Sequence, residues 1–319
     1  MKISRCLPAL LLGLCLVAQA KEPFPQKTED DILREFLWQQ FISLPQQQRP
    51  TVGLALSAGG VRGFAHVGTL EVLDNAGVPI DRLAGTSMGS VVGSLYAAGL
   101  PTEKLWEVGQ HITMDKISAD INLIGALRFL FGKKLPSSAN LVNFFHEQLG
   151  DMHFEDLKIP FACPAMDIKT GERVEFTSGP LAIAVRASMN LPGVFEPVQY
   201  RHRALVDGAV VDYLPVELVR SLGADYIIAS VTPPDFFSKT PTSVAGYINR
   251  VGDVRGAAMI EESAQKANFV LVNRVLDTGT LELSKLEDAG EVGVVQAHTH
   301  LKELQEDLLL FSLPYVLKP

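Results

Sequence analysis

Cysteine is scarce in this chain, and long hydrophobic runs are missing after the first twenty residues. The 319 residues include three cysteines, and Cys6 and Cys15 both lie in those first twenty. Cys163 is then alone, and a single cysteine cannot form an internal disulfide. Stability must therefore come from a hydrophobic core, for which a composition that is 47% hydrophobic and 20% charged provides ample material. Cys163 lies in an apolar run and is predicted to be buried and inert.

Basic charge is also in short supply. Lys and Arg number 28 against 36 Asp and Glu, a formal net charge of −8. Without a basic stripe, this balance argues against nucleic acid as a partner. The sequence has no calcium loop, no zinc-ligand spacing, no P-loop and no complete dinucleotide fingerprint. We therefore predict neither a metal nor a cofactor.

The first twenty residues have the pattern of a secretory signal peptide. Lys2 and Arg5 precede an apolar run over residues 7–17, and residues 18–20 read AQA, an A-x-A cleavage site. The run is shorter than the ~20 residues of a membrane-spanning helix, although an uncleaved anchor is the alternative. The pattern predicts export, either to the periplasm or to the outside of the cell.

The remaining chain divides into a polar extension over residues 21–50, partly helical and ending in a linker, and a catalytic domain over 51–319. The domain begins with a strand, a glycine-rich turn, a helix, a second strand and a second helix, predicted over residues 52–56, 57–63, 64–75, 80–86 and 87–98. This order predicts an α/β protein with a mostly parallel central sheet flanked by helices. Both turns follow the carboxyl ends of strands, where sites in such sheets lie.

The later part of the domain is less regular. The alternation stops over residues 113–150, and the core motifs end near 231, before a largely helical portion over 241–319. Further strands are predicted at residues 161–167, 173–176, 204–206 and 226–231, helices at 180–189 and 291–310, and a mixture over 241–271.

A serine between two glycines joins the second predicted strand to the second predicted helix. Residues 85–89 read GTSMG, with Ser87 between Gly85 and Gly89. This pattern builds a nucleophile elbow, a turn so sharp that side chains at the two glycine positions would collide. The turn leaves the serine hydroxyl at the top of the sheet, so Ser87 is the predicted nucleophile.

The glycine-rich turn over residues 57–63 reads SAGGVRG. The N–H groups of Gly59, Gly60 and Val61 can point at one spot, and the start of a helix adds partial positive charge. A phosphate cradle, a purely structural turn and an oxyanion hole all fit this pattern, and the neighbouring elbow favours the oxyanion hole. Arg62 either braces the turn or contacts an anionic head group.

Asp207 and Gly208 follow a short predicted strand. The aspartate at its end is expected to point toward the same edge of the sheet as Ser87, and the glycine permits a close approach of the backbone. A turn aspartate in a D-G hairpin is the alternative.

In order and approximate spacing, the turn at 59–63, the elbow at 85–89 and the DGA of 207–209 resemble the patatin-like phospholipase family. The resemblance extends from about Val52 to Val231 and includes residues 64–68 (FAHVG), 185–188 (VRAS) and 191–195 (LPGVF). The family usually has glycine where this chain has Ala58.

The resemblance implies a three-layer α/β fold and a Ser-Asp dyad. Ser87 would attack an ester carbonyl and form an acyl-enzyme, while Asp207 would take the serine proton and later activate water. Gly59, Gly60 and Val61 would form the oxyanion hole. The positions that support these motifs are Arg62, Gly63, Gly85, Gly89 and Gly208. The implied substrate is a phospholipid or lysophospholipid, and the family needs no metal.

Three other interpretations stay open. The chain could bind lipid or regulate without catalysis, or transfer the acyl group to an acceptor other than water. An α/β-hydrolase triad in the order Ser-Asp-His would need His298 or His300, the histidines after Asp207. His66 lies in an apolar helix and is predicted to be a core residue.

An apolar stretch at residues 121–131, followed by Lys133 and Lys134, is a candidate for peripheral membrane contact. A core helix or a lid is the equal alternative.

Overall fold

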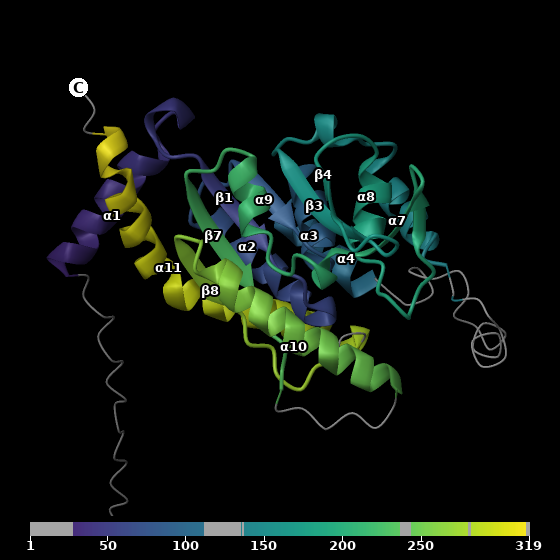
Figure 1. Cartoon of the computed structure of the whole chain (residues 1–319). Helices are drawn as coiled ribbons and strands as arrows, with labels where there is room; N and C mark the ends of the chain where they lie inside the picture. Colours follow the sequence, from purple (N-terminus) through teal and green to yellow (C-terminus); the bar gives the residue numbers. More distant parts are fainter. Residues whose placement is uncertain (1–27, 112–134, 136, 237–243, 280–281, 317–319) are drawn as a thin grey trace, which may run out of the picture.

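A central sheet organises the computed structural model of this chain, which describes residues 28–111, 135, 137–236, 244–279 and 282–316 (Figure 1). The predicted signal peptide and the apolar stretch at 121–131 lie outside the described residues. The sheet has eight strands in the order β5-β6-β3-β2-β1-β7-β8, with β4 paired to β3. The strands are β1 (Val52–Leu56), β2 (Arg82–Gly85), β3 (Phe161–Asp167), β4 (Arg173–Phe176), β5 (Val198–Tyr200), β6 (Arg203–Asp207), β7 (Tyr226–Val231) and β8 (Phe269–Val272).

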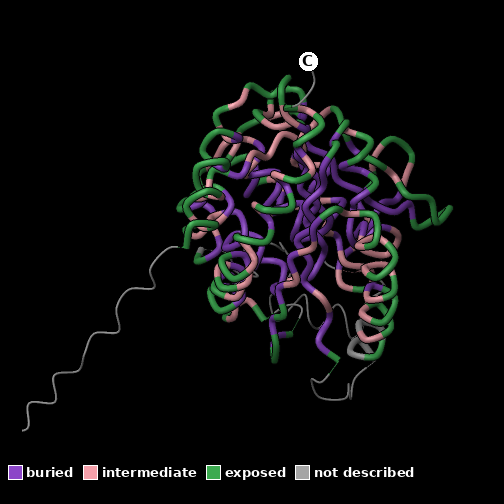
Figure 2. Tube along the Cα trace, turned by 90° about the vertical axis from the view of Figure 1, so that its left-hand side faces the viewer, coloured by how far each residue is buried: buried purple, intermediate pink, exposed green. Residues whose placement is uncertain are grey.

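Helices cover both faces of this sheet, and buried residues run through its middle (Figure 2). One face packs against α2 (Ala65–Asn75), α3 (Met88–Ala97), α4 (Thr102–His111), α7 (Asn140–Leu149), α8 (Leu181–Ser188) and α11 (Leu286–Val316). The other face packs against α9 (Val216–Ser221) and α10 (Val244–Ala264). Short 3-10 helices are η1 (Gln46–Gln48), η2 (Gly60–Phe64), η3 (Phe154–Asp156), η4 (Gly208–Val210) and η5 (Leu283–Lys285). The predicted three-layer α/β fold is confirmed.

The two faces of the sheet differ in side-chain size because alternate residues of a strand point to opposite sides. Leu54 and Leu56 of β1 join the large core cluster, whereas Ala55 joins the cluster under α9. Small residues dominate the α9 side, so that helix lies close to the strands. An added Cβ at Gly53 would lie 2.2 Å from a methyl carbon of Val219 in α9.

Parallel pairing dominates the part of the sheet that carries the first two predicted turns. β1 pairs in parallel with β2 and β7, β2 with β3, and β7 with β8. The antiparallel pairs are β3 with β4 and β6, and β5 with β6. The carboxyl ends of β1 and β2 therefore lie side by side, as the sequence predicts.

Glycines allow α2 and α11 to pack with their backbones in close contact. An added Cβ at Gly68 would lie 2.1 Å from the carbonyl oxygen of Gly290, and one at Gly293 would lie 1.9 Å from that of Ala65. The helix predicted at 291–310 is the middle of α11, which runs Leu286–Val316. The sequence does not predict its first turns, because glycine has poor helix propensity. Close packing against α2 overrides that propensity here.

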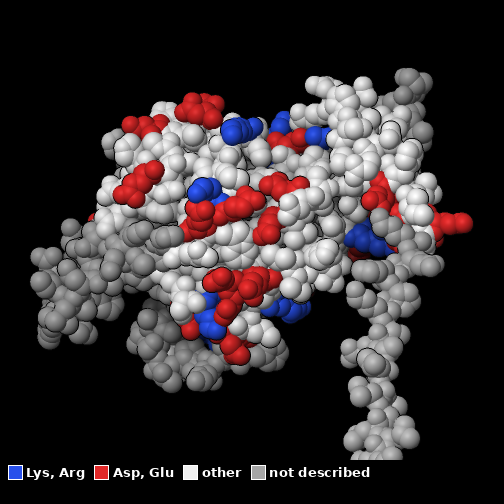
Figure 3. Space-filling model, turned by 180° about the vertical axis from the view of Figure 1, so that it is seen from behind, with Lys and Arg blue, Asp and Glu red and all other residues white. Residues whose placement is uncertain are grey.

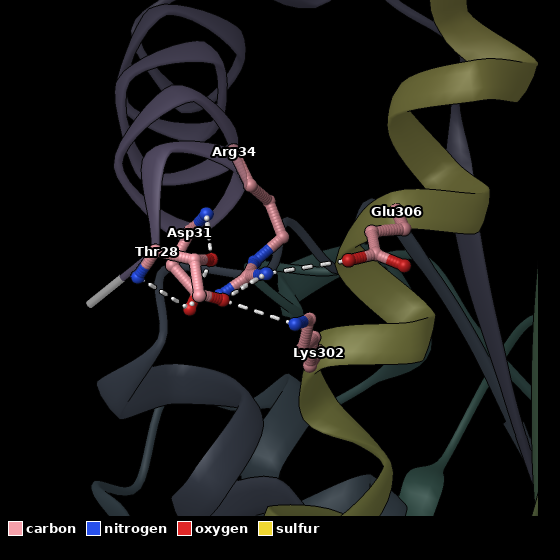
Figure 4. Close-up of polar contacts among 5 residues, drawn as sticks. All are labelled: Thr28, Asp31, Arg34, Lys302 and Glu306. Atoms are coloured by element: carbon pink, nitrogen blue, oxygen red, sulfur yellow. Dashed lines mark hydrogen bonds and ion pairs between the residues drawn. The ribbon is translucent and has the colours of Figure 1, made fainter. Parts of the chain in front are cut away.

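Helix α1 (Glu29–Ile42) attaches the described part of the extension to the domain. Its Trp38 and Phe41 are buried, and the indole N–H of Trp38 donates to the carbonyl oxygen of Ala76 at 2.8 Å. Side chains of α1 also pair with α11 (Figure 4). Those ion pairs join Asp31 to Lys302 at 3.0 Å and Arg34 to Glu306 at 3.3 Å. Thr28 is the N-cap of α1: its hydroxyl accepts from the Asp31 N–H, and the Asp31 carboxylate accepts from the Thr28 N–H.

On the face shown in Figure 3, acidic and basic side chains are interspersed, and the described residues form no continuous basic stripe across it. None of the described helices combines the length and hydrophobicity that a membrane crossing requires. Cys163 is fully buried on β3, as predicted, and burial raises the pKa of its thiol far above the ordinary value.

Candidate active site

Ser87 occupies a strained strand-to-helix turn between β2 and α3. Its φ is 53° and its ψ is −121°, a region that residues with side chains rarely adopt. The flanking glycines make the turn possible. An added Cβ at Gly85 would lie 2.1 Å from the Gly89 carbonyl oxygen, and one at Gly89 would lie 2.5 Å from the Leu56 carbonyl oxygen. The turn has the geometry of a nucleophile elbow.

The Ser87 hydroxyl donates a hydrogen bond of 2.7 Å to Oδ2 of Asp207. Ser87 is 6% exposed and Asp207 is 1% exposed, so water is largely excluded from this pair. The two residues are 120 positions apart in the sequence. The fold therefore brings the predicted serine and aspartate within direct proton-transfer distance.

Asp207 reaches the site from an unexpected direction. β3 continues past the end of β2, and its outer part pairs with β6, which runs antiparallel to it. Asp207 therefore lies at the end of a strand that runs back toward the carboxyl ends of the parallel strands, opposite in direction to β1 and β2. Gly208 lets the chain after Asp207 pass close to the backbone of β3, because an added Cβ there would lie 2.3 Å from the Pro164 carbonyl oxygen.

Burial shapes the electrostatics of Asp207. The loss of solvation raises the pKa of this carboxyl from 3.8 to about 7, and hydrogen bonds from the Ala209 N–H and from Ser87 oppose the rise. The Ala209 N–H donates to Oδ1 at 2.8 Å, while Oδ2 faces the serine. A carboxylate with this pKa is a much stronger base than an exposed one.

The glycine-rich turn lies beside this pair. Gly59 has φ 168° and ψ 0°, and Gly60 has φ 56°, which favours glycine. No described residue accepts a hydrogen bond from the N–H of Gly59 or Gly60 outside η2 itself. An added Cβ at Gly63 would lie 2.7 Å from Cβ of Met88, so this turn and the elbow are in direct contact.

Hydrogen bonds tie the three segments together. The Ala58 N–H donates to the carbonyl oxygen of Tyr213 at 2.9 Å, which joins the glycine-rich turn to the segment after Asp207. The hydroxyl of Thr86 donates to the carbonyl oxygen of Asp212 at 2.9 Å, which joins the elbow to the same segment. Ala58 is buried, and these hydrogen bonds form with its methyl group in place.

A cavity of about 230 Å³ opens over these residues. Its wall is formed by Ala58, Gly59, Gly60, Arg62, Ser87, Leu191, Pro192, Asp207, Ala209, Val210, Tyr213, Gly252, Asp253 and Arg255. No motif marks Val210, Tyr213 or the three residues of α10, so the sequence gives no sign that they line the cavity. Val61 is buried in η2 and does not line the cavity.

Arg62 is buried within the cavity wall and both braces the turn and faces the cavity. Its guanidinium donates to Oδ1 of Asp253 at 3.3 Å and to the Thr278 carbonyl oxygen at 3.4 Å. Its Nε has no hydrogen-bond partner among the described residues.

None of the described histidines, His298 and His300 included, lines the cavity. His66 is fully buried, as predicted, and bonds to Ser230 and Ser57. His300 bonds to the Gln296 carbonyl oxygen of its own helix, α11. A Ser-Asp-His triad therefore finds no support in this geometry. Among the described residues, no group of three His, Cys, Asp or Glu side chains is arranged to hold a metal ion.

An α/β fold that places a serine elbow against a buried aspartate and a glycine-rich turn defines a class of serine–aspartate proteins. The sequence model of the patatin-like phospholipase family matches residues 54–220, more than half of the chain. The chain belongs to the patatin-like phospholipase family.

Relatives show how much of larger proteins this chain represents. It is 36% identical over 183 residues to an uncharacterized NTE family protein of Mycobacterium tuberculosis, covering 56% of this chain and 48% of that one. It is 30% identical over 297 residues to lysophospholipase NTE1 of Eremothecium gossypii, covering 82% of this chain and 19% of that one. The chain thus spans about half of the first relative and a fifth of the second.

A solved structure shares the fold. The crystal structure of VipD from Legionella pneumophila aligns with a TM-score of 0.50 at 12% identity, over 80% of this chain and 67% of that chain. At this identity the likeness concerns the fold alone.

Proposed function

We propose that this protein is a serine lipid acyl hydrolase that cleaves carboxylic esters of phospholipids or lysophospholipids. The observation that carries the proposal is the 2.7 Å hydrogen bond from Ser87 to the buried Asp207, at the wall of a cavity that the glycine-rich turn also lines. A lysophospholipase among the relatives supports the substrate class.

In the proposed reaction, Asp207 accepts the Ser87 proton as the hydroxyl oxygen attacks the ester carbonyl carbon. The N–H groups of Gly59 and Gly60, which line the cavity, stabilise the oxyanion that develops. Asp207 then gives the proton to the departing alkoxide, which leaves an acyl-enzyme. In the second half, Asp207 takes a proton from water, the hydroxide attacks the acyl group, and the proton returns to Ser87.

The cavity lining suits a lipid ester. Apolar side chains from Leu191, Pro192 and Val210 can contact an acyl chain, and the exposed Arg255 supplies positive charge that suits an anionic head group. The charge of Arg62 is paired with Asp253 in the same wall. Peripheral contact with a membrane belongs to the same proposal. Export through the leader at residues 1–20 is a separate proposal, which rests on the sequence alone.

The proposal is tested by incubating the purified chain with mixed phospholipids and lysophospholipids and identifying the products by mass spectrometry. We expect free fatty acid and the matching deacylated lipid. Lipid binding without products would support the non-catalytic alternative. Acyl esters of an added alcohol, formed in place of fatty acid, would support acyl transfer.

The pH dependence of the reaction should follow Asp207. Only its ionised form accepts the serine proton, and its pKa is raised to about 7. We expect kcat/KM to rise with pH, to reach half its maximum near pH 7 and to level off above it. Initial rates with a soluble ester between pH 5 and 9 provide the measurement, and a flat profile across this range would refute the assignment.

Gly59→Ala is expected to lower kcat by about 10²-fold, the usual cost of one lost oxyanion donor. The added Cβ would lie 2.2 Å from the Thr232 hydroxyl oxygen and 3.0 Å from the Gly63 nitrogen, so the turn must shift. Gly279→Ala is the matched control, because its added Cβ meets only ordinary contacts. Steady-state kinetics of both variants provide the comparison, and an unchanged kcat for Gly59→Ala would remove this turn from the mechanism.

A further inference from the structure

A buried threonine outside every recognised motif contacts the glycine-rich turn. Thr232 directly follows β7, which pairs with β1 in parallel, so it lies at the same edge of the sheet as the turn. It is fully buried, and its hydroxyl donates to the Ala58 carbonyl oxygen at 2.7 Å.

A second hydroxyl supports the same carbonyl group. Ser57 Oγ donates to the Ala58 carbonyl oxygen at 2.8 Å and accepts from the Thr232 N–H at 2.9 Å. Both lone pairs of that oxygen are thereby engaged by buried hydroxyl groups. The arrangement closes a small ring of hydrogen bonds between the ends of β1 and β7.

The Ala58 carbonyl belongs to the peptide unit that carries the Gly59 N–H. A trans peptide is planar, with its C=O and N–H pointing in opposite directions. Fixing the carbonyl oxygen on the Thr232 side therefore fixes the direction of the Gly59 N–H. Thr232 also lies directly against Gly59, since only the absence of a Cβ there leaves space for its hydroxyl.

The preceding peptide unit is fixed as well. The Ser57 carbonyl oxygen accepts from Nε2 of His66 at 2.9 Å, and the Ala58 N–H of the same peptide donates to Tyr213. A carbonyl oxygen can only accept, so His66 carries its proton on Nε2, and Nδ1, 2.8 Å from Ser230 Oγ, accepts from that hydroxyl. Burial lowers the pKa of His66 to about 4, which keeps the ring neutral.

We propose that Thr232, together with Ser57, is a positioning residue that aims the Gly59 N–H at the oxyanion. The inference rests on the proposed function, because it assigns a direction to one donor of the proposed oxyanion hole. His66 supports the assembly by fixing Ser57. None of the three lines the cavity. Their effect reaches the reaction through the peptide units on either side of Ala58.

The test uses Thr232→Val, which keeps the shape of the side chain and removes its hydroxyl. The donor N–H remains but loses one of two restraints, so we expect kcat to fall about 10-fold, less than the loss of a whole donor. KM should stay within about 2-fold, since the oxyanion exists only in the transition state. Thr232→Ser keeps the hydroxyl and should restore most of kcat.

Two further variants keep the test decisive. Ser57→Ala removes the other hydroxyl and should give a similar loss in kcat, which tests the proposal even if Thr232→Val fails to fold. Thr102→Val is the matched control, because Thr102 is a buried threonine at the start of α4 and should leave kcat unchanged. Thermal midpoints of all variants are measured alongside the kinetics.

The outcomes separate the two proposals. An inactive wild-type chain would overturn the proposed hydrolase function itself. An active wild type with unchanged kcat in both Thr232→Val and Ser57→Ala would overturn only the positioning role. A loss of kcat that Thr232→Ser does not restore, or one accompanied by an equal rise in KM, would also contradict it.

Discussion

Ser87→Ala is expected to lower kcat for ester hydrolysis by about 10⁴-fold or more. The variant removes the atom that bonds to the acyl group, and nucleophile removal in serine hydrolases has effects of this size. The fold should survive, because an alanine fits the elbow and the substitution removes only the side-chain hydrogen bond to Asp207 that the described residues show. Fatty acid release from a lysophospholipid, followed over hours, provides the measurement.

The control for this variant is Ser94→Ala. Ser94 is a fully buried serine on the helix that Ser87 precedes, and among the described residues its hydroxyl donates to the Val91 carbonyl oxygen of that same helix. Its removal should leave kcat within about 2-fold of the wild type, as ordinary substitutions away from a site do. Comparable activity in Ser87→Ala and the wild type would show that another group performs the attack.

Asp207→Asn is expected to reduce kcat by a similar factor while making the protein more stable at alkaline pH. An amide cannot accept the serine proton, yet it fits the same space and accepts from Ala209. The folded pKa of Asp207 is about 7 against an ordinary value of 3.8. The folded state therefore holds the proton more tightly, and the contribution of Asp207 to the free energy of unfolding falls as pH rises from about 4 through 7.

This shift sets the size of the stability effect. Above pH 7 the buried carboxylate is ionised in the folded protein. A pKa shift of this size then lowers the free energy of unfolding by about 4 kcal/mol. The thermal midpoint of Asp207→Asn should exceed that of the wild type at pH 8, and the difference should shrink toward pH 4. Asp30→Asn, at an exposed side chain in the first turn of α1, is the control and should show no such trend. Equal midpoints at pH 8 would argue against a strained, ionised Asp207.

Local chemistry explains which parts of the site the sequence could predict. The sharp turn leaves no space for a side chain at Gly85 or Gly89, and the motif alone predicts this. In the structure, an added Cβ at either position would collide with backbone atoms. The strands at Val52–Leu56 and Tyr226–Val231 are apolar and short, so pattern and structure agree on their bounds.

Long-range geometry explains what the sequence could not provide. The approach of Asp207 on a strand antiparallel to β3 depends on β3 extending past β2, which no local pattern encodes. Asp253 and Arg255 reach the cavity because α10 packs against the turn that follows Asp207, where Nε of Arg255 donates to the Val210 carbonyl oxygen at 2.9 Å. Their surroundings in the sequence carry no motif. The proposed role of Thr232 depends on a hydrogen bond to a backbone carbonyl group. In the sequence such a residue is one threonine among many, with no motif around it.

Helix α7 was not predicted from the sequence, for a related reason. α7 at Asn140–Leu149 lies in the part where the α/β alternation stops, and its buried Leu141, Phe144 and Phe145 pack on neighbours distant in sequence. Tertiary contacts of this kind override weak local propensity.

Covalent labelling tests the central claim most directly. The purified chain is treated with an alkyl fluorophosphonate, digested, and analysed by mass spectrometry to locate the adduct. We predict a single phosphonylated residue, Ser87, with labelling slowed strongly in Asp207→Asn. An adduct on a different residue, or full hydrolytic activity in a chain whose Ser87 is completely labelled, would contradict the account.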